Sequence, residues 1–587
     1  MNELATTTPP ARFVRALSLD ELHSAGSKVA RIEGHSILFV HHAGEFFAID
    51  NRCPHMGFPL DRGSIHDCIL TCHWHHARFD LRTGGTFDPW ADDVRIFPIE
   101  IRDSEIWVDV APRAGVLPHA RIRLREGLEQ NISWVVAKSV LTLLDGGELP
   151  ATPFRAGLEF GVHYRGNGWS QGLTILTCMA NLLPHLRMQD RPRALVHGLS
   201  AVASDCEGQP PRFGLRPLPD SASDPGLLAK WFRRFIEVRD AEGAERCLVS
   251  AVRAQSKPEA LAGMLFAAAT DHRYIELGHV LDFINKAFEA LDIAGWDLAE
   301  PVLASLASGL ASADRMEEAN SWRHPVDLVS ILENAFAKIP QALAAGREKR
   351  GEWAGRATLK TILLGEDPQE IADGLLDALR AGASEDDLAA TVAHAAACRI
   401  AHFHVSNEFG DWDTALHTFT FANAVHQGVR RAPSAEFVRG AFDAAMSIYL
   451  DRFLNVPWIS LPEPRGKALD PEVRWRAFGD LLDRQQQVNE AAAIVVDSLH
   501  AKEDPAPMLA AIGKALLRED RNFHTIQAVE AAFRQFSLAG SPDHARDVMV
   551  AAARYLAAHA PTARAQSQTY RIAERLHRGD RLYEGGP

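Results

Sequence analysis

Two short arms near the N-terminus, each carrying one cysteine and one histidine, constrain this chain more than any other feature. The first arm is Cys53-Pro-His55, the second is Cys72-His-Trp-His75, and sixteen residues separate His55 from Cys72. Two thiolates and two imidazoles suit a [2Fe–2S] cluster whose irons differ, with sulfur ligands on one iron and nitrogen ligands on the other. A Cys₂His₂ zinc site competes, but its arms usually pair like with like, C-x-x-C and then H-x₃₋₅-H. The mixed arms therefore favour a cluster held by Cys53, His55, Cys72 and His75.

The second arm and the turn after it resemble the Rieske family, in Cys72-His-Trp-His75-His-Ala-Arg-Phe-Asp80-Leu-Arg-Thr-Gly84-Gly. The resemblance covers residues 11–112, the usual size of a small domain. Ala77 and Phe79 stand near the places of the Ser and Tyr that bond to the cluster in high-potential members. We therefore expect a reduction potential toward the low end of the Rieske range of roughly −150 to +300 mV, which suits electron delivery to an oxygenase better than quinol oxidation.

Other cysteines and histidines near the arms have simpler interpretations. His73 and His76 flank the ligand His75 at the wrong offset from Cys72, and we interpret them as loop residues. Cys68 alternates with Leu70 and Cys72 on a predicted strand, which is typical of a small packing residue.

Charge and composition limit the cellular compartments and the classes of binding partner that we expect. A net charge of −14 with no basic run argues against nucleic acid and against an anionic membrane surface as partners. No run approaches the eighteen apolar residues that a membrane span needs. Of the seven cysteines, two are assigned to the cluster and five are scattered, so they form no disulfide framework. The N-terminus has neither a basic nor an apolar signal region, and we therefore expect a cytoplasmic protein.

The fold class expected from these patterns is multidomain, with a small all-β domain followed by a large all-α domain. Residues 11–112 are predicted to form short strands rich in β-branched and aromatic residues. The capping-box spacing of Ser18 and Glu21 predicts the start of one short helix. Residues 113–119, with Pro and Gly, are the expected linker. Residues 120–587 are the expected helical domain, rich in Ala, Leu, Glu and Arg and without a strict repeat period.

One predicted helix shows what periodicity alone predicts about the exposure of polar residues in this domain. Apolar side chains recur from Tyr274 to Leu291, and His272, His279, Asp282 and Lys286 lie on the opposite side. Periodicity predicts that this opposite side faces solvent.

Histidine is dense in the helical domain, and imidazole is the commonest metal ligand in proteins. Five histidines fall within 33 positions: His394, His402, His404, His417 and His426. The helix around His417 is apolar nearly all round, so we expect a buried ring, which is more often satisfied by a hydrogen bond than by a metal. Taken one by one, these histidines are better explained as structural residues than as metal ligands.

A second resemblance, to the questin oxidase-like proteins, runs in patches over residues 150–540. His272-Arg-Tyr-Ile-Glu-Leu-Gly278-His-Val-Leu-Asp282-Phe283 is similar to their H-P-L-I-H-L-G-Y-x-L-E-F stretch, and Asp413-Thr-Ala-Leu-His417-Thr is similar to D-F-x-L-M-H. Glu519-Asp520 ahead of His524 echoes an acidic pair that precedes a ligand histidine and then a lysine. Fungal members of that family oxidatively open anthraquinone rings.

What this second resemblance implies is a non-haem iron, held by several histidines and a carboxylated lysine, that activates O₂ against an aromatic polyketide. Carried over by position, the iron ligands are His197, His272, His417 and His524. Gln527 stands where the family places its lysine, so a lysine ligand would have to come from Lys286 or Lys514 on another helix.

The expected function is a Rieske [2Fe–2S] oxidoreductase whose cluster feeds a histidine-ligated non-haem iron for O₂-dependent oxidation of an aromatic, quinone-like substrate. An external NAD(P)H-dependent reductase or ferredoxin would reduce the cluster, since no glycine-rich dinucleotide motif is present. A homo-oligomer is compatible with the resemblance, because Rieske oxygenases often place one subunit's cluster against a neighbour's iron.

Two alternatives stay open at this point. In one, the chain is a ferredoxin-type electron carrier whose helical part is a protein-interaction scaffold without a second metal. In the other, the iron is held by two histidines and a carboxylate around His402, His404 and Asp411.

Overall fold

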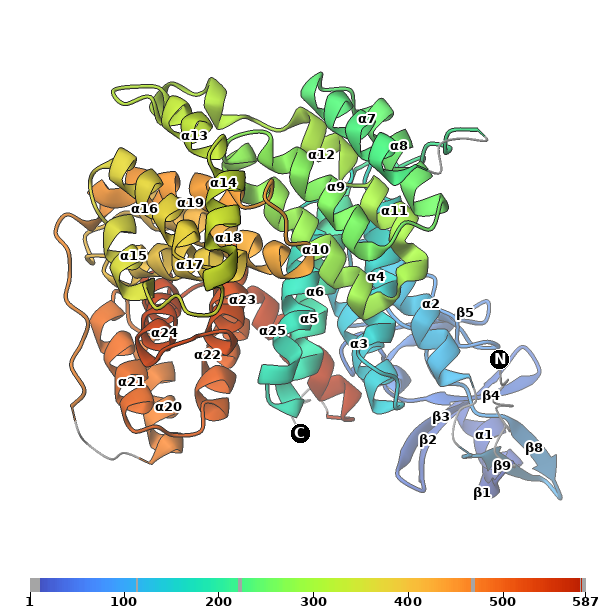
Figure 1. Cartoon of the computed structure of the whole chain (residues 1–587). Coiled ribbons are helices and arrows are strands. Elements are labelled where there is room, and N and C mark those ends of the chain that lie inside the picture. Colours follow the sequence, from blue (N-terminus) through green and yellow to red (C-terminus); the bar gives the residue numbers. More distant parts are fainter. Residues whose placement is uncertain (1–10, 112–114, 220–223, 466–469, 581, 583–587) are drawn as a thin grey trace. The chain divides into compact units, whose positions relative to one another are not determined.

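The computed structural model describes residues 11–111, 115–219, 224–465, 470–580 and 582 (Figure 1). The chain divides into two compact units, one formed by Met1–Pro153 with Gln566–Pro587 and the other by Phe154–Ala565. The first unit holds the sheets and the second is helical, which confirms the expected order of a small all-β domain before a large helical region.

The first unit contains three antiparallel sheets of three strands, ordered β1-β9-β8, β2-β3-β4 and β5-β6-β7. The strands are β1 (Phe13–Ser18), β2 (Ser27–Ile32), β3 (His35–His42), β4 (Glu45–Asp50), β5 (Ser64–His66), β6 (Ile69–Thr71), β7 (Arg78–Asp80), β8 (Ile99–Arg102) and β9 (Glu105–Asp109). Among these strands lies the α-helix α1 (Leu19–Ala25). It starts with the predicted capping box, because the Ser18 hydroxyl accepts from the Glu21 backbone N–H while the Glu21 carboxylate accepts from the Ser18 backbone N–H.

Two apolar cores support these sheets. Phe39 and Ile106 belong to the core between the β1-β9-β8 and β2-β3-β4 sheets. The other core gathers Leu70 and Phe79 of the small β5-β6-β7 sheet with the cysteines Cys53 and Cys72. The cluster arms are therefore rooted in a buried core.

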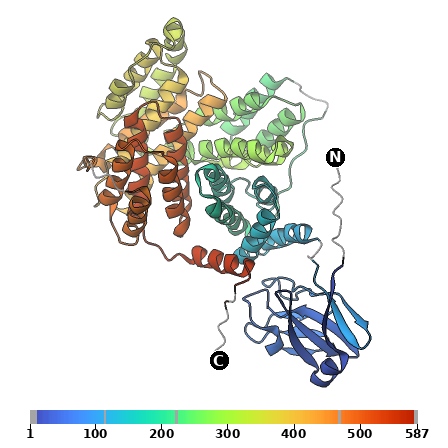
Figure 2. The ribbon, with the colours of Figure 1, turned by 90° about the horizontal axis from the view of Figure 1, so that it is seen from below.

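Three helices complete the first unit: α2 (Val116–Glu129), α3 (Ser133–Asp145) and α25 (Ala565–His577). The C-terminal helix α25 lies beside the α2–α3 hairpin (Figure 2), and His577 contacts Asp145 at 2.6 Å between Nε2 and Oδ2. Of the expected linker, residues 113 and 114 lie outside the described residues, and Val116–His119 already belong to α2. The sheets thus share their compact unit with residues that the sequence patterns place in the helical domain.

The second unit consists of helices joined by turns and by some longer loops, among them residues 207–219 and 456–465. They are α4 (Ala151–His163), α5 (Gln171–Leu182), α6 (Arg191–Cys206), α7 (Pro225–Glu237), α8 (Ala241–Arg253), α9 (Pro258–Thr270), α10 (His279–Ala294), α11 (Ala299–Ala304), α12 (Ala307–Ser312), α13 (Leu328–Phe336), α14 (Ile339–Gly346), α15 (Arg356–Leu363), α16 (Pro368–Arg380), α17 (Glu385–Ala401), α18 (Phe409–Arg431), α19 (Arg439–Leu450), α20 (Pro471–Leu481), α21 (Val488–His500), α22 (Ala506–Arg518), α23 (Phe523–Ser537) and α24 (Pro542–Ala558). Local signals start many of them: ahead of α16, for example, the Asp367 carboxylate accepts from the backbone N–H of Gln369 and Pro368 occupies the first turn.

The predicted solvent-facing side of the stripe from Tyr274 to Leu291 is wrong. Asp282 and Lys286 are only 2% and 1% exposed. The helix α10 packs against α5, α9 and α18, and Gln527 of α23 donates to Asp282, so α10 is covered on both sides. Periodicity failed because the polar side of α10 is buried as an ion-paired network rather than solvated.

Among the helices that the structure describes, none combines the length and the apolar character needed to cross a bilayer.

Candidate metal centres

The first cluster arm is a tight loop between β4 and β5. The Cys53 backbone N–H donates to the Phe58 carbonyl and the Gly57 N–H donates to the Cys53 carbonyl, both at 2.8 Å. Gly57 has a φ of +80°, and a Cβ there would lie 3.3 Å from the Leu576 side chain. Glycine suits this position because it adopts the left-handed backbone without cost and has no Cβ to press on Leu576.

The second arm, between β6 and β7, repeats the same loop. The Cys72 N–H donates to the Ala77 carbonyl at 2.8 Å and the His76 N–H donates to the Cys72 carbonyl at 3.0 Å. His76 stands where the first loop has Gly57 and also has a positive φ, of +63°. This supports the interpretation of His76 as a loop residue, because its role in the turn is set by the backbone.

The two sulfurs lie side by side at the base of these loops. The Cys53 thiol donates a hydrogen bond to the Cys72 sulfur, which raises the pKa of Cys53 well above its ordinary value and lowers the pKa of Cys72 to about 6. Both side chains are buried. Two adjacent sulfurs on one side of the site are what a single iron with two thiolate ligands requires.

The two imidazoles lie together in the same way. The rings of His55 and His75 meet edge to face, with their centroids 4.9 Å apart. The buried Nδ1 of His55 has no hydrogen-bond partner among the described residues, and burial lowers the pKa of this imidazole to about 4, so the ring is neutral. A pair of imidazoles next to a sulfur pair fits a [2Fe–2S] cluster, with Cys53 and Cys72 on one iron and His55 and His75 on the other.

A helical cap covers one of these two histidines. Trp134 of α3 and Trp90 lie against the His55 ring, with centroid distances of 5.8 and 4.7 Å. The Trp134 indole N–H donates to the Trp90 carbonyl at 2.8 Å, which fixes the cap. His75 is exposed, whereas His55 is half-buried. The two imidazole edges are therefore not equivalent toward a redox partner.

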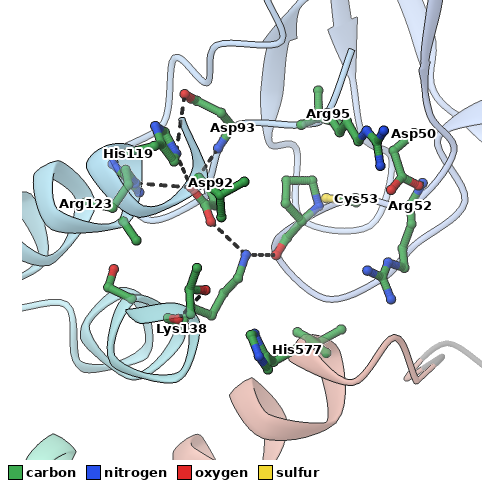
Figure 3. A pocket seen from close by; sticks show the side chains of 17 residues that line it. Asp50, Arg52, Cys53, Asp92, Asp93, Arg95, His119, Arg123, Lys138 and His577 are labelled. Atoms are coloured by element: carbon green, nitrogen blue, oxygen red, sulfur yellow. Dashed lines mark hydrogen bonds and ion pairs between the residues drawn. The ribbon is translucent and has the colours of Figure 1, made fainter. Parts of the chain in front are cut away.

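Lys138 of α3 joins the cap to the first cluster loop across a cavity of about 260 Å³ (Figure 3). Its Nζ donates to the Pro54 carbonyl at 3.3 Å and to the Asp92 carboxylate at 2.9 Å. Burial alone would raise the pKa of Asp92, but Lys138, His119 and Arg123 hold it well below its ordinary value. A positive charge is thus placed against the backbone of the cluster loop and is paired with the half-buried Asp92 carboxylate.

A second group of potential ligands lies in the helical unit. His279 of α10, His417 of α18 and His524 of α23 bring their ring nitrogens within 4.8 Å of one another. The Nε2 atoms of His279 and His417 are 3.0 Å apart. Burial lowers the pKa of His279 to about 3 and that of His524 to about 4, so both imidazoles are neutral, the form that binds a metal.

The surroundings of these rings orient their free nitrogens. The Nδ1–H of His417 donates to the Asp413 carbonyl at 2.6 Å, which leaves Nε2 as the ligand atom. The Asp413 carboxylate accepts from the Tyr555 hydroxyl at 2.6 Å and lies 3.8 Å from Nδ1 of His524. The buried Nε2 of His524 has no hydrogen-bond partner among the described residues. Three neutral imidazoles that converge in this way can hold a transition metal and leave coordination positions open.

The chain enters this group through a strained turn. Tyr274, Glu276 and Leu277 have φ values of +39°, +49° and +51°, and Gly278 has +92°. A Cβ on Gly278 would lie 2.7 Å from the Phe421 side chain on α18, so glycine permits the close approach of α10 to α18. Backbone strain of this kind concentrates at functional sites.

Two of the four histidines predicted as iron ligands lie in this group and two do not. His417 and His524 belong to it. His272 is buried and its Nδ1 lies 2.8 Å from the Glu317 carboxylate. His197 of α6 is also buried, and its Nε2 has no hydrogen-bond partner among the described residues.

His279 lies with His417 and His524 where His272 was expected to lie, and sequence reasoning missed it. Periodicity puts it on the supposed solvent-facing side of one long helix. The signal that could have found it is Gly278, since a glycine directly before His279 indicates that a new helix starts there. A ligand in the first turn of a helix can point across to its neighbours.

The candidate lysine ligands have other positions. Lys286 is buried in ion pairs with Glu289 and Glu530, at 2.9 and 2.7 Å. Lys514 is exposed on α22. Gln527 lies one turn after His524 and donates to Asp282, while its buried Oε1 has no hydrogen-bond partner among the described residues.

The alternative ligand set around α17 and α18 is engaged locally. His402 pairs through Nδ1 with the Ile459 carbonyl at 2.6 Å and stacks on Trp458. His404 pairs with the Ser406 hydroxyl at 2.6 Å. The Asp411 carboxylate accepts from the Glu408 N–H in a capping box. Within the described residues, these three side chains do not form a metal-binding group.

Comparison with known proteins covers the N-terminal part of the chain. Residues 12–98 match the profile of the Rieske [2Fe-2S] domain. The ferredoxin component of the p-cumate 2,3-dioxygenase system of Pseudomonas putida is 37% identical over 115 residues, which are 19% of this chain and 96% of the ferredoxin. The ferredoxin subunit of 3-phenylpropionate/cinnamic acid dioxygenase from Photorhabdus laumondii is 32% identical over 96 residues, 16% of this chain and 90% of the subunit.

A longer relative is matched over a smaller share of its length. Human apoptosis-inducing factor 3 is 26% identical over 182 residues, which are 31% of this chain and 27% of that protein. The chain thus spans almost all of two ferredoxins but only about a quarter of this larger relative.

Proposed function

Because this chain belongs to the Rieske [2Fe–2S] family, we propose that its cluster passes electrons to an iron held by His279, His417 and His524 for O₂-dependent oxidation of an aromatic substrate. The electron-carrier part of this function is supported by the likeness to ferredoxins of dioxygenase systems. The observation that carries the enzymatic part is the convergence of three neutral imidazoles from three helices of the same chain.

The protein's own residues have distinct tasks in this proposal. His279, His417 and His524 hold the metal, and the Asp413 carbonyl fixes which nitrogen of His417 faces it. The Asp413 carboxylate, held by Tyr555, lies beside His524 and favours one orientation of that ring. Iron bound there supplies the O₂ chemistry. The resemblance to questin oxidase-like proteins supports a planar, quinone-like substrate.

Electrons enter the cluster from an external NAD(P)H-dependent reductase or ferredoxin. The open edge for this exchange is His75, because His55 lies beneath Trp90 and Trp134. Trp74, 37% exposed and with its ring 4.5 Å from that of His75, adds an aromatic surface at this edge.

Metal analysis with electron paramagnetic resonance on the full chain tests the proposal. We expect a third iron per chain besides the two of the cluster. His279→Ala should lose this third iron and keep the cluster signal, which also reports that the protein has folded. His272→Ala is the matched control, since its ring pairs with Glu317, and it should keep all three irons.

A second candidate function is a ferredoxin-type carrier with a helical scaffold, favoured by the coverage of nearly the whole length of two stand-alone ferredoxins. Two irons per chain in well-folded wild-type protein would support the carrier and contradict the oxygenase. Loss of the third iron in His272→Ala but not in His279→Ala would contradict the assignment of His279 as an iron ligand.

A further inference from the structure

A further group of side chains of the types that bind metals lies between two other helices of the helical unit. The helices α17 and α24 pack against each other (Figure 1). On α17, His394 and Cys398 are four residues apart, and on α24, His544 and Asp547 are three apart, so each pair shares one helix face. All four side chains are buried.

Three of these side chains already converge on one point. The Oδ2 atom of Asp547 lies 2.9 Å from Nε2 of His394 and 3.3 Å from the sulfur of Cys398. No two of these three atoms are more than 4.8 Å apart. Tetrahedral zinc, with bonds of about 2.0–2.3 Å, places its ligand atoms about 3.3–3.8 Å apart. The spacing is therefore close to that of a metal site.

His544 supplies an independent sign of a ligand. Its ring stacks on that of His394, with the centroids 4.4 Å apart and the planes 17° apart. The side chain is deeply buried, since only 3% is exposed, and its Nε2 has no hydrogen-bond partner among the described residues. A buried imidazole nitrogen without a partner is costly unless something else binds it.

Neighbouring groups hold the carboxylate in place for a metal. Arg546 donates to Oδ1 of Asp547 through Nε and Nη2, at 2.9 and 2.8 Å, and so leaves Oδ2 directed at His394 and Cys398. Fixing one carboxylate oxygen in this way orients the other as a ligand. Lys360 also approaches Oδ2, at 3.4 Å, but its side chain is 24% exposed and can move out to solvent.

We propose that His394, Cys398 and Asp547 form a zinc site that ties α17 to α24, and that His544 becomes the fourth ligand when its ring turns out of its stack on His394. Two imidazoles, one thiolate and one carboxylate are ligand types that zinc prefers, and a full set of four leaves no open position, as in structural sites. Binding displaces the Cys398 thiol proton to solvent. The site is separate from the three histidines of α10, α18 and α23, and it does not depend on the oxygenase proposal.

Zinc analysis of the full chain tests the site, on anaerobically purified protein with its iron–sulfur cluster intact. The His417→Ala background removes the three-histidine group as a competing zinc site. We expect about one zinc per chain, with one sulfur neighbour at about 2.3 Å by X-ray absorption. Cys398→Ala should lose the zinc, whereas Cys247→Ala, another buried free cysteine, should retain it.

Should Cys398→Ala fail to fold, His544→Gln keeps a polar side chain of similar shape and should also lose most of the zinc. Zinc retained in Cys398→Ala or His544→Gln would overturn the proposal. So would wild-type protein that binds no zinc, or binds it without a sulfur neighbour. These side chains would then be only a hydrogen-bonded pair of His394 and Asp547, whose charge is neutralised by Lys360 and Arg546.

Discussion

The cluster arms and the three-histidine group are two candidate metal centres built on opposite principles. Each arm is one short loop closed by two backbone hydrogen bonds, the first between β4 and β5 and the second between β6 and β7. The three histidines come from α10, α18 and α23, which are far apart in the chain and meet only through helix packing. The cluster arms can therefore be predicted from a few residues of sequence, while the three-histidine group exists only in the packed domain.

The difference is clearest in the local backbone. Gly57 and His76 occupy equivalent positions with positive φ, so the shape of each cluster loop follows from its own residues. His279 depends instead on a strained turn and on the close approach of Gly278 to Phe421 of another helix. A centre of the first kind tolerates changes elsewhere, whereas a centre of the second kind fails when a distant helix moves.

The largest expected effect is at the locally built centre. Cys72→Ala removes one thiolate of the sulfur pair, and the whole cluster should be lost, with both of its irons and its paramagnetic signal. The helical unit should keep its far-ultraviolet circular dichroism, because its helices do not depend on the loop. Cys68→Ala is the matched control: Cys68 is also buried nearby but is not among the proposed ligands, so its removal should leave the cluster signal unchanged. A cluster that survives in Cys72→Ala would contradict the ligand assignment.

The helically built region should differ in its response to pH. Asp451 follows α19 and is buried, which raises its pKa to about 7, although Thr418 donates to it at 2.6 Å. The folded state then holds a proton that the unfolded state loses above about pH 4, so the stability of the helical unit falls as pH rises from about 4 to about 7. Asp451→Asn should remove roughly 2 kcal/mol of the difference in unfolding free energy between pH 5 and pH 8.

Chemical denaturation followed by circular dichroism at both pH values measures this difference. Asp373→Asn, an exposed residue on α16, is the control and should leave the pH profile unchanged. An identical profile for Asp451→Asn and wild type would show that this carboxyl titrates alike in both states.

The smallest effect sharpens the comparison, because it asks whether the cluster depends on anything outside its loops. Lys138→Met removes the positive charge beside the Pro54 carbonyl and leaves Asp92 paired only with Arg123 and His119, so reduction becomes less favourable. We expect the reduction potential to fall by about 20–60 mV. Asp92→Asn leaves Lys138 uncompensated and should shift the potential upward. Protein-film voltammetry measures both, and shifts in the same direction would contradict an electrostatic role for the pair.

Much of the first unit could be predicted because its signals are local. The capping box of Ser18 and Glu21, the alternating strands and the four residues proposed as cluster ligands all lie within short stretches. The helical cap could not be predicted in the same way. Trp134 and Lys138 lie on α3, in the part that composition places in the helical domain, and only packing brings them to His55 and Pro54.

The helical unit shows which features of the structure cannot be predicted from sequence patterns. Composition and periodicity predict its helices, but they also predict a solvated side of α10 that is in fact buried. Periodicity reports which side of a helix is apolar, and it cannot report that a polar side is buried in ion pairs such as Lys286 with Glu530. For the same reason, family resemblance favours His272 where the packed helices present His279.

The amino-acid sequence by itself determined the order of the two regions and the form of the two loops that carry the proposed cluster ligands, because short-range backbone geometry places residues that are close in the chain. Only the tertiary structure decided which histidines of the helical unit meet and which helices cover the cluster. The physical reason is that the relative positions of distant helices come from the packing of whole faces, to which no single motif corresponds.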